Sequence, residues 1–166
     1  MKKMLIFLFL SLLTLIICFC GCNVKETYAL ECVSDSIIAQ PACYLAMDIP
    51  ENVFLTESSD MGRYAVFTHE DYEIIQEIFT AEHMDEALFY VSGRHRDDLR
   101  PIELQDGSMR FAWTAARETG EIACSAVLFT DGQFYYSVCV RCPAELEKQY
   151  REEFSALLSN AALLHV

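Results

Sequence analysis

The sequence predicts an α+β fold, in which one antiparallel sheet of about five to seven strands carries helices on its faces and ends in a C-terminal helix. Two observations lead to this prediction. An Asp-Gly pair at 131–132 lies between two runs of β-branched and aromatic residues, which is the strongest short-range signal for a β-hairpin. After Pro143, apolar residues recur at helical spacing as far as Ala161, so a helix is expected to cover one face of the sheet.

Counting outward from the turn assigns partners to the hairpin strands. A two-residue type I′ turn at Asp131-Gly132 places Thr130 opposite Gln133 and Cys124 opposite Cys139. The two cysteines would then form a hydrogen-bonded pair, with Cα atoms about 5.5 Å apart. That separation is within the range of a disulfide.

A second turn adds a third strand to this hairpin. A turn at Thr119-Gly120 would lay residues 111–117 beside the first strand and place Trp113 near Ala126. The prediction is therefore a three-stranded antiparallel meander at the centre of the sheet.

Further strands are predicted on the N-terminal side of the meander. They cover 43–49, 63–68 and 72–79, with a short apolar piece at 53–56 and an ambiguous edge strand at 32–38. In the 72–79 strand, Ile74 and Ile78 point to one side of the sheet, whereas Ile75 and Phe79 point to the other. Apolar residues on both sides of a strand indicate a sheet that is covered on both faces.

Two helices are predicted. Thr80 is a suitable N-cap and Gly93 a suitable end for the first, because Met84, Leu88 and Val91 recur between them at helical spacing. A polar loop at 94–98, a strand at 99–104, a turn at 106–107 and a strand at 109–117 should follow. The second helix should start at Pro143 and carry an apolar stripe of Leu146, Tyr150, Phe154, Leu157 and Ala161.

Length and charge limit the function classes. A chain of 166 residues is enough for one domain, and a formal charge of −13 makes nucleic acid an unfavourable partner, because the acidic body repels phosphate. Removal of Lys2 and Lys3 with a leader would leave 10 basic and 25 acidic residues, a charge of −15.

The N-terminus is typical of an exported protein. Lys2-Lys3 precedes an almost wholly apolar run at 4–19, which predicts a signal peptide over 1–21, although an uncleaved membrane anchor is the alternative. The junction Phe19-Cys20-Gly21-Cys22 resembles a bacterial lipoprotein signal, in which the cysteine after a small residue carries the lipid. This resemblance implies a lipid on Cys22, a tether over 22–30, a folded domain over 31–166 and a location at the extracytoplasmic face of the cell membrane.

The order of elements resembles the PsbP-like fold. The resemblance is carried by Tyr64-Ala-Val-Phe67 through Tyr72-Glu-Ile-Ile75, the helix that ends at Gly93, and the hairpin at 131–132 followed by Tyr135-Tyr136-Ser-Val138. It covers roughly 44–161. Proteins of this fold mostly act as docking modules, so the resemblance implies binding and not catalysis, and it carries over no binding residue.

The cysteines are the first candidate site residues. Disulfides are allowed in an exported domain, and the candidate pairs are Cys124 with Cys139 and Cys32 with Cys43; buried free thiols are the alternative. Cys142 is then left over. Cys139 and Cys142 also form a C-x-x-C sequence before a helix, which raises the alternative of a thiol–disulfide redox protein.

Other chemistry has weaker support. The sequence contains no zinc-ligand spacing, calcium loop, phosphate loop or G-x-S-x-G elbow. We therefore expect no metal, no cofactor and no enzyme activity. A hydrolase whose site is assembled from distant residues is a further alternative. Arg94-His95-Arg96 could hold an anion or pair with nearby acids. Phe111, Trp113, Leu128 and Tyr135 share one face and should form core or rim an apolar groove. We therefore expect a binding or accessory lipoprotein, with an envelope protein or a small ligand as its partner.

Overall fold

The computed structural model describes residues 40–59, 61–118 and 120–165. The predicted signal peptide, the lipid attachment at Cys22, the tether, the ambiguous 32–38 strand and Cys32 lie outside these residues. Within them, no helix is both long enough and apolar enough to cross a membrane.

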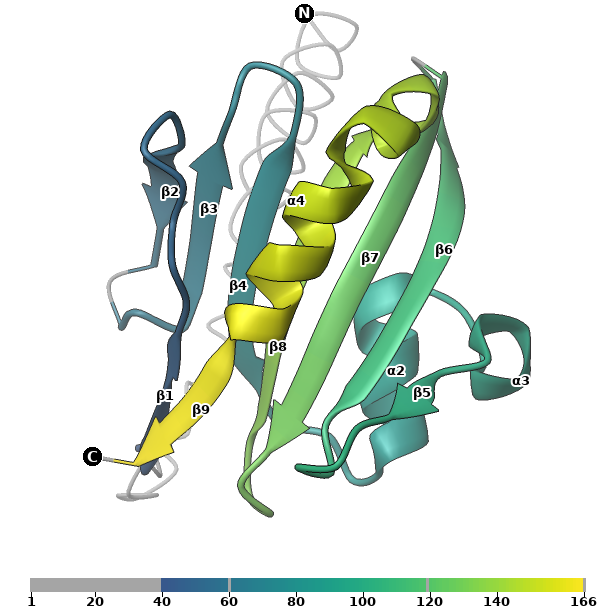
Figure 1. Cartoon of the computed structure of the whole chain (residues 1–166). Helices are drawn as coiled ribbons and strands as arrows, with labels where there is room; N and C mark the ends of the chain where they lie inside the picture. The colour runs from purple at the N-terminus through teal and green to yellow at the C-terminus, as the bar shows by residue number, and fades with distance from the viewer. Residues whose placement is uncertain (1–39, 60, 119, 166) are drawn as a thin grey trace, which may run out of the picture. The chain divides into compact units, whose positions relative to one another are not determined.

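Seven antiparallel strands form the main sheet, in the order β2-β3-β4-β8-β7-β6-β5 (Figure 1). The strands are β2 (Phe54–Ser58), β3 (Tyr64–Thr68), β4 (Glu73–Phe79), β8 (Tyr135–Pro143), β7 (Gly120–Thr130), β6 (Met109–Arg117) and β5 (Ile102–Glu103). The helical segments are α2 (Met84–Ser92), α3 (Arg96–Leu99), η1 (Ala144–Leu146) and α4 (Glu147–Asn160). The predicted α+β class, with a single main antiparallel sheet and a C-terminal helix, is confirmed.

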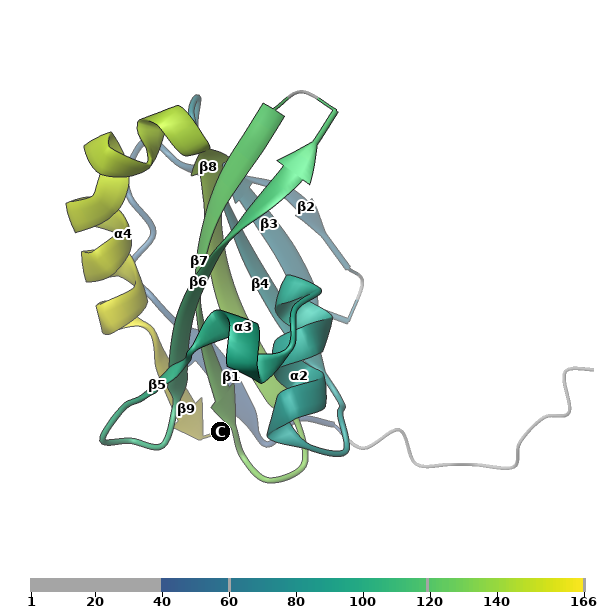
Figure 2. The ribbon, with the colours of Figure 1, turned by 90° about the vertical axis from the view of Figure 1, so that its right-hand side faces the viewer.

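The helices cover both faces of the sheet. Figure 2 shows α4 on one side, with α2 and α3 on the other. On the α4 side, Phe154 and Leu158 of the helix are buried, as are Tyr136, Val138 and Val140, which alternate along β8.

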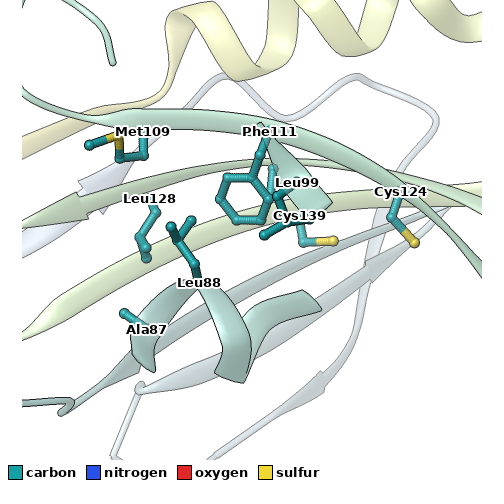
Figure 3. Packing of buried hydrophobic residues seen from close by; sticks show 9 residues of the cluster. Ala87, Leu88, Leu99, Met109, Phe111, Cys124, Leu128 and Cys139 are labelled. Carbon is teal, nitrogen blue, oxygen red and sulfur yellow. The ribbon is translucent and has the colours of Figure 1, made fainter. Parts of the chain in front are cut away.

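The core on the other face forms beneath α2. Ala87 and Leu88 are the buried residues of this helix, and they pack in a cluster with Phe111, Ala126 and Leu128 of the central strands (Figure 3). The remaining buried members of the cluster are Leu99, Met109, Cys124 and Cys139. Ala87 and Leu88, together with the partly buried Met84 and Val91, thus attach α2 to the sheet.

The central hairpin differs from its predicted register by two residues. Thr130 pairs with Tyr135, not with Gln133, and Ala126 instead of Cys124 lies opposite Cys139. The reason is a loop of four residues: the Asp131 carboxylate accepts hydrogen bonds from the amides of Gln133 (2.9 Å) and Phe134 (2.7 Å). An aspartate that binds the backbone in this way stabilises a longer turn than a type I′ pair.

The second hairpin is also shifted by two residues. Arg117 pairs with Gly120, so Trp113 lies opposite Cys124, and the predicted pairing of Trp113 with Ala126 was wrong. A shift of two residues leaves every side chain on its predicted face, because side chains alternate with a period of two. The assignment of faces therefore survives although the partners changed.

Three predictions near the ends of elements were also wrong. The first helix begins at Met84 after His83, not at Thr80, and the Glu86 carboxylate accepts the Glu82 amide hydrogen at 2.7 Å, which satisfies a backbone donor there. The predicted 94–98 loop contains α3, and the predicted 99–104 strand shrinks to Ile102–Glu103. The predicted end at Gly93 is confirmed, with φ of 67° and its amide bonded to the Phe89 carbonyl at 2.7 Å.

A second, small sheet joins the two ends of the described domain. The predicted 43–49 strand is shorter than expected, β1 (Cys43–Ala46), and it pairs antiparallel with β9 (Ala162–His165). The C-terminal strand was not predicted, because its two leucines continue the apolar pattern of the preceding helix.

Candidate functional site

The α2 side of the sheet is covered over only part of its length. Beyond the helix lies a pocket of about 340 Å³, which we call the thiol pocket. Its apolar walls include Ile75, Val91, Trp113 and Ile122, and its polar groups are Tyr64, Glu77, Arg117, Arg141, Cys124 and Cys139. In Figure 3, Cys139 and Cys124 lie beyond Phe111, on the side away from Ala87.

The sheet register builds the floor of the thiol pocket. Glu73, Arg141, Cys124 and Trp113 are consecutive partners across β4, β8, β7 and β6. Residues directly opposite each other in an antiparallel pair project to the same face, so four strands deliver one row of side chains, of which Arg141, Cys124 and Trp113 line the pocket. The shift of two residues in each hairpin is what aligns this row.

Charge is distributed unevenly around the pocket. Arg141 donates from its Nε to the Glu73 carboxylate, and this pair is only partly exposed. Glu77 lies four residues after Glu73 in β4, and its side chain therefore projects to the same face. Burial raises the pKa of Glu77, and the Arg141 guanidinium offsets part of that rise. Burial also raises the pKa of Tyr64, and the carboxylates of Glu57 and Glu77 add to the effect.

Two charged side chains of the pocket form no direct ion pair within the described part of the chain. Among these residues, Glu77 forms no ion pair and no side-chain hydrogen bond, and the same holds for Arg117. A partly buried carboxylate without a partner is unfavourable, so a cationic group that entered the pocket would stabilise it.

The thiols of Cys124 and Cys139 are diagonal neighbours across β7 and β8. Their residues are 5% and 7% exposed, and both are free thiols. Interaction with Cys139 lowers the pKa of Cys124, with a contribution from the positive charges of Arg141 and Arg117. The same interaction, together with burial, raises the pKa of Cys139. Cys124 is therefore the more acidic thiol of the pair.

The C-x-x-C cysteines do not meet. Both Cys139 and Cys142 lie within β8, three residues apart, so they project from opposite faces of the sheet. Burial and the nearby Glu147 carboxylate raise the pKa of Cys142 to about 11, the reverse of what a redox nucleophile needs. This geometry counts against the redox alternative.

Cys43 has a different neighbour from the predicted one. Its Sγ lies 3.1 Å from Nδ1 of His165, because β1 pairs with β9. Its proposed partner Cys32 is outside the described residues. The contact with His165 was not foreseen, since the β9 strand was not predicted.

The other predicted site residues are divided between core and surface. Phe111 and Leu128 are core beneath α2, Tyr135 packs against that core, and only Trp113 of the four lines the thiol pocket. In the basic cluster, Arg96 pairs with Asp85 at 3.0 Å and Arg94 donates to the Thr114 carbonyl at 2.8 Å. Both arginines are thus engaged locally.

Sequence reasoning missed Glu77 and Arg117 as site residues. Neither belongs to a motif. The available signal was a charged residue inside a predicted strand, as at Glu77 in the EIIQEIF run of β4. Among the residues that the structure describes, no group of three or more His, Cys, Asp or Glu side chains is arranged to hold a metal ion.

Comparisons with known proteins identify the fold. No family model matches the chain, and no curated protein matches its sequence. The solved structures that resemble it include LpqN of Mycobacterium tuberculosis, described as involved in cell envelope biogenesis, with 9% identity, a TM-score of 0.50, and coverage of 76% of this chain and 87% of that one. The PsbP protein (CyanoP) of the cyanobacterium Synechocystis gives the same identity and TM-score, and coverage of 76% of this chain and 95% of that one. The domain therefore has a PsbP-like fold.

Proposed function

We propose that this protein is an extracytoplasmic, membrane-tethered lipoprotein that binds a small zwitterionic ligand with an apolar side group, such as an amino acid or a short peptide, without catalysis. The observation that carries the proposal is the thiol pocket, in which Glu77 and Arg117 lie beside an apolar wall and form no direct ion pair among the described residues.

The charges of the pocket favour a zwitterion. An ammonium group near Glu77 would stabilise its ionised form against the effect of burial, and a carboxylate could bind the guanidinium of Arg117. A purely anionic ligand would leave Glu77 uncompensated, and a purely cationic one would be repelled by Arg117 and Arg141. Specificity for a ligand that carries one positive and one negative charge therefore follows from Glu77 and Arg117 together.

The apolar wall and the size favour a compact ligand. Trp113, Ile122 and Ile75 offer flat and branched surfaces for an aliphatic or aromatic side group. A volume of about 340 Å³ is near the lower end of the range for small-molecule sites.

The membrane tether rests on the lipoprotein-type junction at Cys22 and on an envelope context. LpqN, whose structure resembles this one, is described as taking part in cell envelope biogenesis. The strongly acidic composition disfavours nucleic acid as a partner.

Trp113 is the single tryptophan of the chain, so its fluorescence reports on the thiol pocket. The test titrates the full-length protein, in nanodiscs of zwitterionic lipid, with leucine, its anionic N-acetyl form and its cationic amide. Leucine should give a saturable shift in emission, and the two singly charged forms should bind at least tenfold more weakly. No saturable shift, or equal binding of all three, would contradict the proposal.

Two variants test the assigned roles. Glu77→Gln should remove the discrimination between leucine and N-acetyl-leucine, whereas Arg117→Gln should remove the discrimination between leucine and its amide. Glu152→Gln, on the exposed surface of α4, is the matched control and should bind as the unmodified protein does.

A further inference from the structure

A second cavity lies on the opposite face of the sheet, between α4 and the β5–β6 edge. Its volume is about 480 Å³. We call it the arginine groove, after the residues that matter here: Arg100, Arg110, Arg151, Ile102, Phe154 and Leu158. Figure 2 shows that α4 and α2 lie on different sides of the sheet, so this groove is separate from the thiol pocket.

The groove concentrates positive charge in an acidic protein. The described part of the chain has nine lysine and arginine residues, and three of them line this cavity. Glu147 is the acidic residue among its lining groups. The local charge thus opposes that of the rest of the surface, which favours an anion.

Each arginine is placed differently. Arg110 donates to the Ser155 carbonyl and to the Ser159 hydroxyl, both at 3.1 Å, which holds its guanidinium along α4. A guanidinium has five donors, so others remain for a ligand. Arg151 pairs with Glu147 at 3.0 Å in an exposed ion pair, which is weak enough for an anion to replace.

Arg100 is held in an unfavourable backbone conformation. It is the one non-glycine residue of the described chain with positive φ, at 49°, and it caps α3 where glycine is the usual residue. Its side chain makes no ion pair among the described residues. A strained position that is occupied by a charged residue in a cavity is a feature of ligand sites.

Apolar side chains complete the groove. Phe154 and Leu158 are buried beneath it, while Ile102 at its rim is 65% exposed. An inorganic anion would leave the exposed side chain of Ile102 in water. A ligand with an anionic head and a hydrocarbon chain would use both parts of the groove.

We propose that the arginine groove binds a single-chain anionic lipid, with the head group on Arg100, Arg110 and Arg151 and the chain along Ile102 and Phe154. The site does not depend on the ligand of the thiol pocket. Binding there should leave the fluorescence of Trp113 unchanged, so failure of one proposal is distinguishable from failure of the other.

The test is calorimetric titration of the full-length protein in zwitterionic nanodiscs, with empty nanodiscs as reference. The probes are octyl phosphate, octanoate, inorganic phosphate and the uncharged octyl glucoside. Octyl phosphate and octanoate should bind at least tenfold more tightly than the other two. If inorganic phosphate bound equally well, the groove would be a bare anion site. If octyl glucoside bound equally well, the site would be purely apolar, and if no probe bound there would be no site. Each of these three results would overturn the proposal.

Arg100→Gly separates function from folding. It relieves the positive φ and should not lower the melting temperature, yet it should weaken octyl phosphate binding about tenfold, the effect of one lost charge-assisted contact. Arg151→Gln should also weaken binding. Lys148→Gln, on the exposed surface of the same helix, is the charge-matched control and should have no effect. Unchanged binding in Arg100→Gly and Arg151→Gln would refute the assignment.

Discussion

Replacement of Tyr136 by phenylalanine tests the four-residue hairpin loop on which the sheet register depends. The Tyr136 side chain is fully buried, and its hydroxyl donates to Oδ2 of Asp131 at 2.6 Å. Burial and this hydrogen bond raise the pKa of Tyr136. Its neighbour Tyr135, on the other face of β8, has no side-chain hydrogen bond in the described structure and is the matched control.

The size of the effect follows from the charge of the acceptor. A hydrogen bond to an ionised group contributes about 1.5–3 kcal/mol, so Tyr136→Phe should lower the free energy of unfolding by that amount at pH 7. For a domain of this size, the melting temperature should fall by roughly 5–10 °C. Tyr135→Phe should change the free energy of unfolding by less than about 0.5 kcal/mol.

The effect should also depend on pH. Partial burial acts to raise the pKa of Asp131, but hydrogen bonds from the Phe134 amide, the Tyr136 hydroxyl and the Gln133 amide outweigh it and hold the pKa below its ordinary value. Its contribution to stability is therefore present above the unfolded pKa, near 3.8, and is lost as pH falls through the folded value. Urea unfolding should show the gap between the unmodified protein and Tyr136→Phe narrowing below that pH. Equal effects of the two tyrosine variants, or a gap independent of pH, would refute the loop geometry.

Three further predictions follow from the sheet and its α2 side. Because burial raises the pKa of Glu77, the free energy of unfolding should fall as pH rises from about 4.5 through the folded pKa of Glu77. In urea unfolding, Glu77→Gln should abolish this dependence on pH. An unchanged dependence would contradict the burial of Glu77. Leu88→Ala should lower the free energy of unfolding by about 2–5 kcal/mol and speed hydrogen exchange of the α2 amides. Phe89→Ala, at a position that is 47% exposed, should have little effect. Similar losses in the two variants would show that α2 packs differently. Oxidised glutathione should oxidise Cys124 and Cys139 to a disulfide, and the two protons and two electrons that the thiols lose reduce it to two molecules of glutathione. Peptide mapping checks the product. If each cysteine instead carried its own mixed disulfide with glutathione, the proximity of the two thiols would be refuted.

The faces of the sheet could be predicted from the sequence because alternation is a local property. The 109–117 strand, the end of the first helix at Gly93 and the apolar face under α2 were all placed correctly. A register error of two residues does not disturb such assignments. Strand partners, however, depend on loop length, and the Asp131 side chain lengthened one loop beyond what an Asp-Gly pair indicates.

The thiol pocket could not be predicted as a unit. Its residues come from β3, β4, α2, β6, β7 and β8, and they meet only once the register is known. Glu77 and Arg117 look like ordinary surface charges until their strands are placed. The arginine groove was missed for the same reason: its arginines are far apart in sequence, with Arg100 directly after α3, Arg110 in β6 and Arg151 in α4.

We propose that a lipid on Cys22 holds this PsbP-like domain outside the cytoplasm, where the thiol pocket meets its ligand. Intact-mass analysis of the protein extracted from the membrane fraction of producing cells tests it most directly. We expect a chain that begins at Cys22 and carries a diacylglyceryl group on its sulfur, with Cys22→Ser remaining unacylated. A soluble cytosolic chain that retains Met1 and carries no fatty acyl group would contradict the claim.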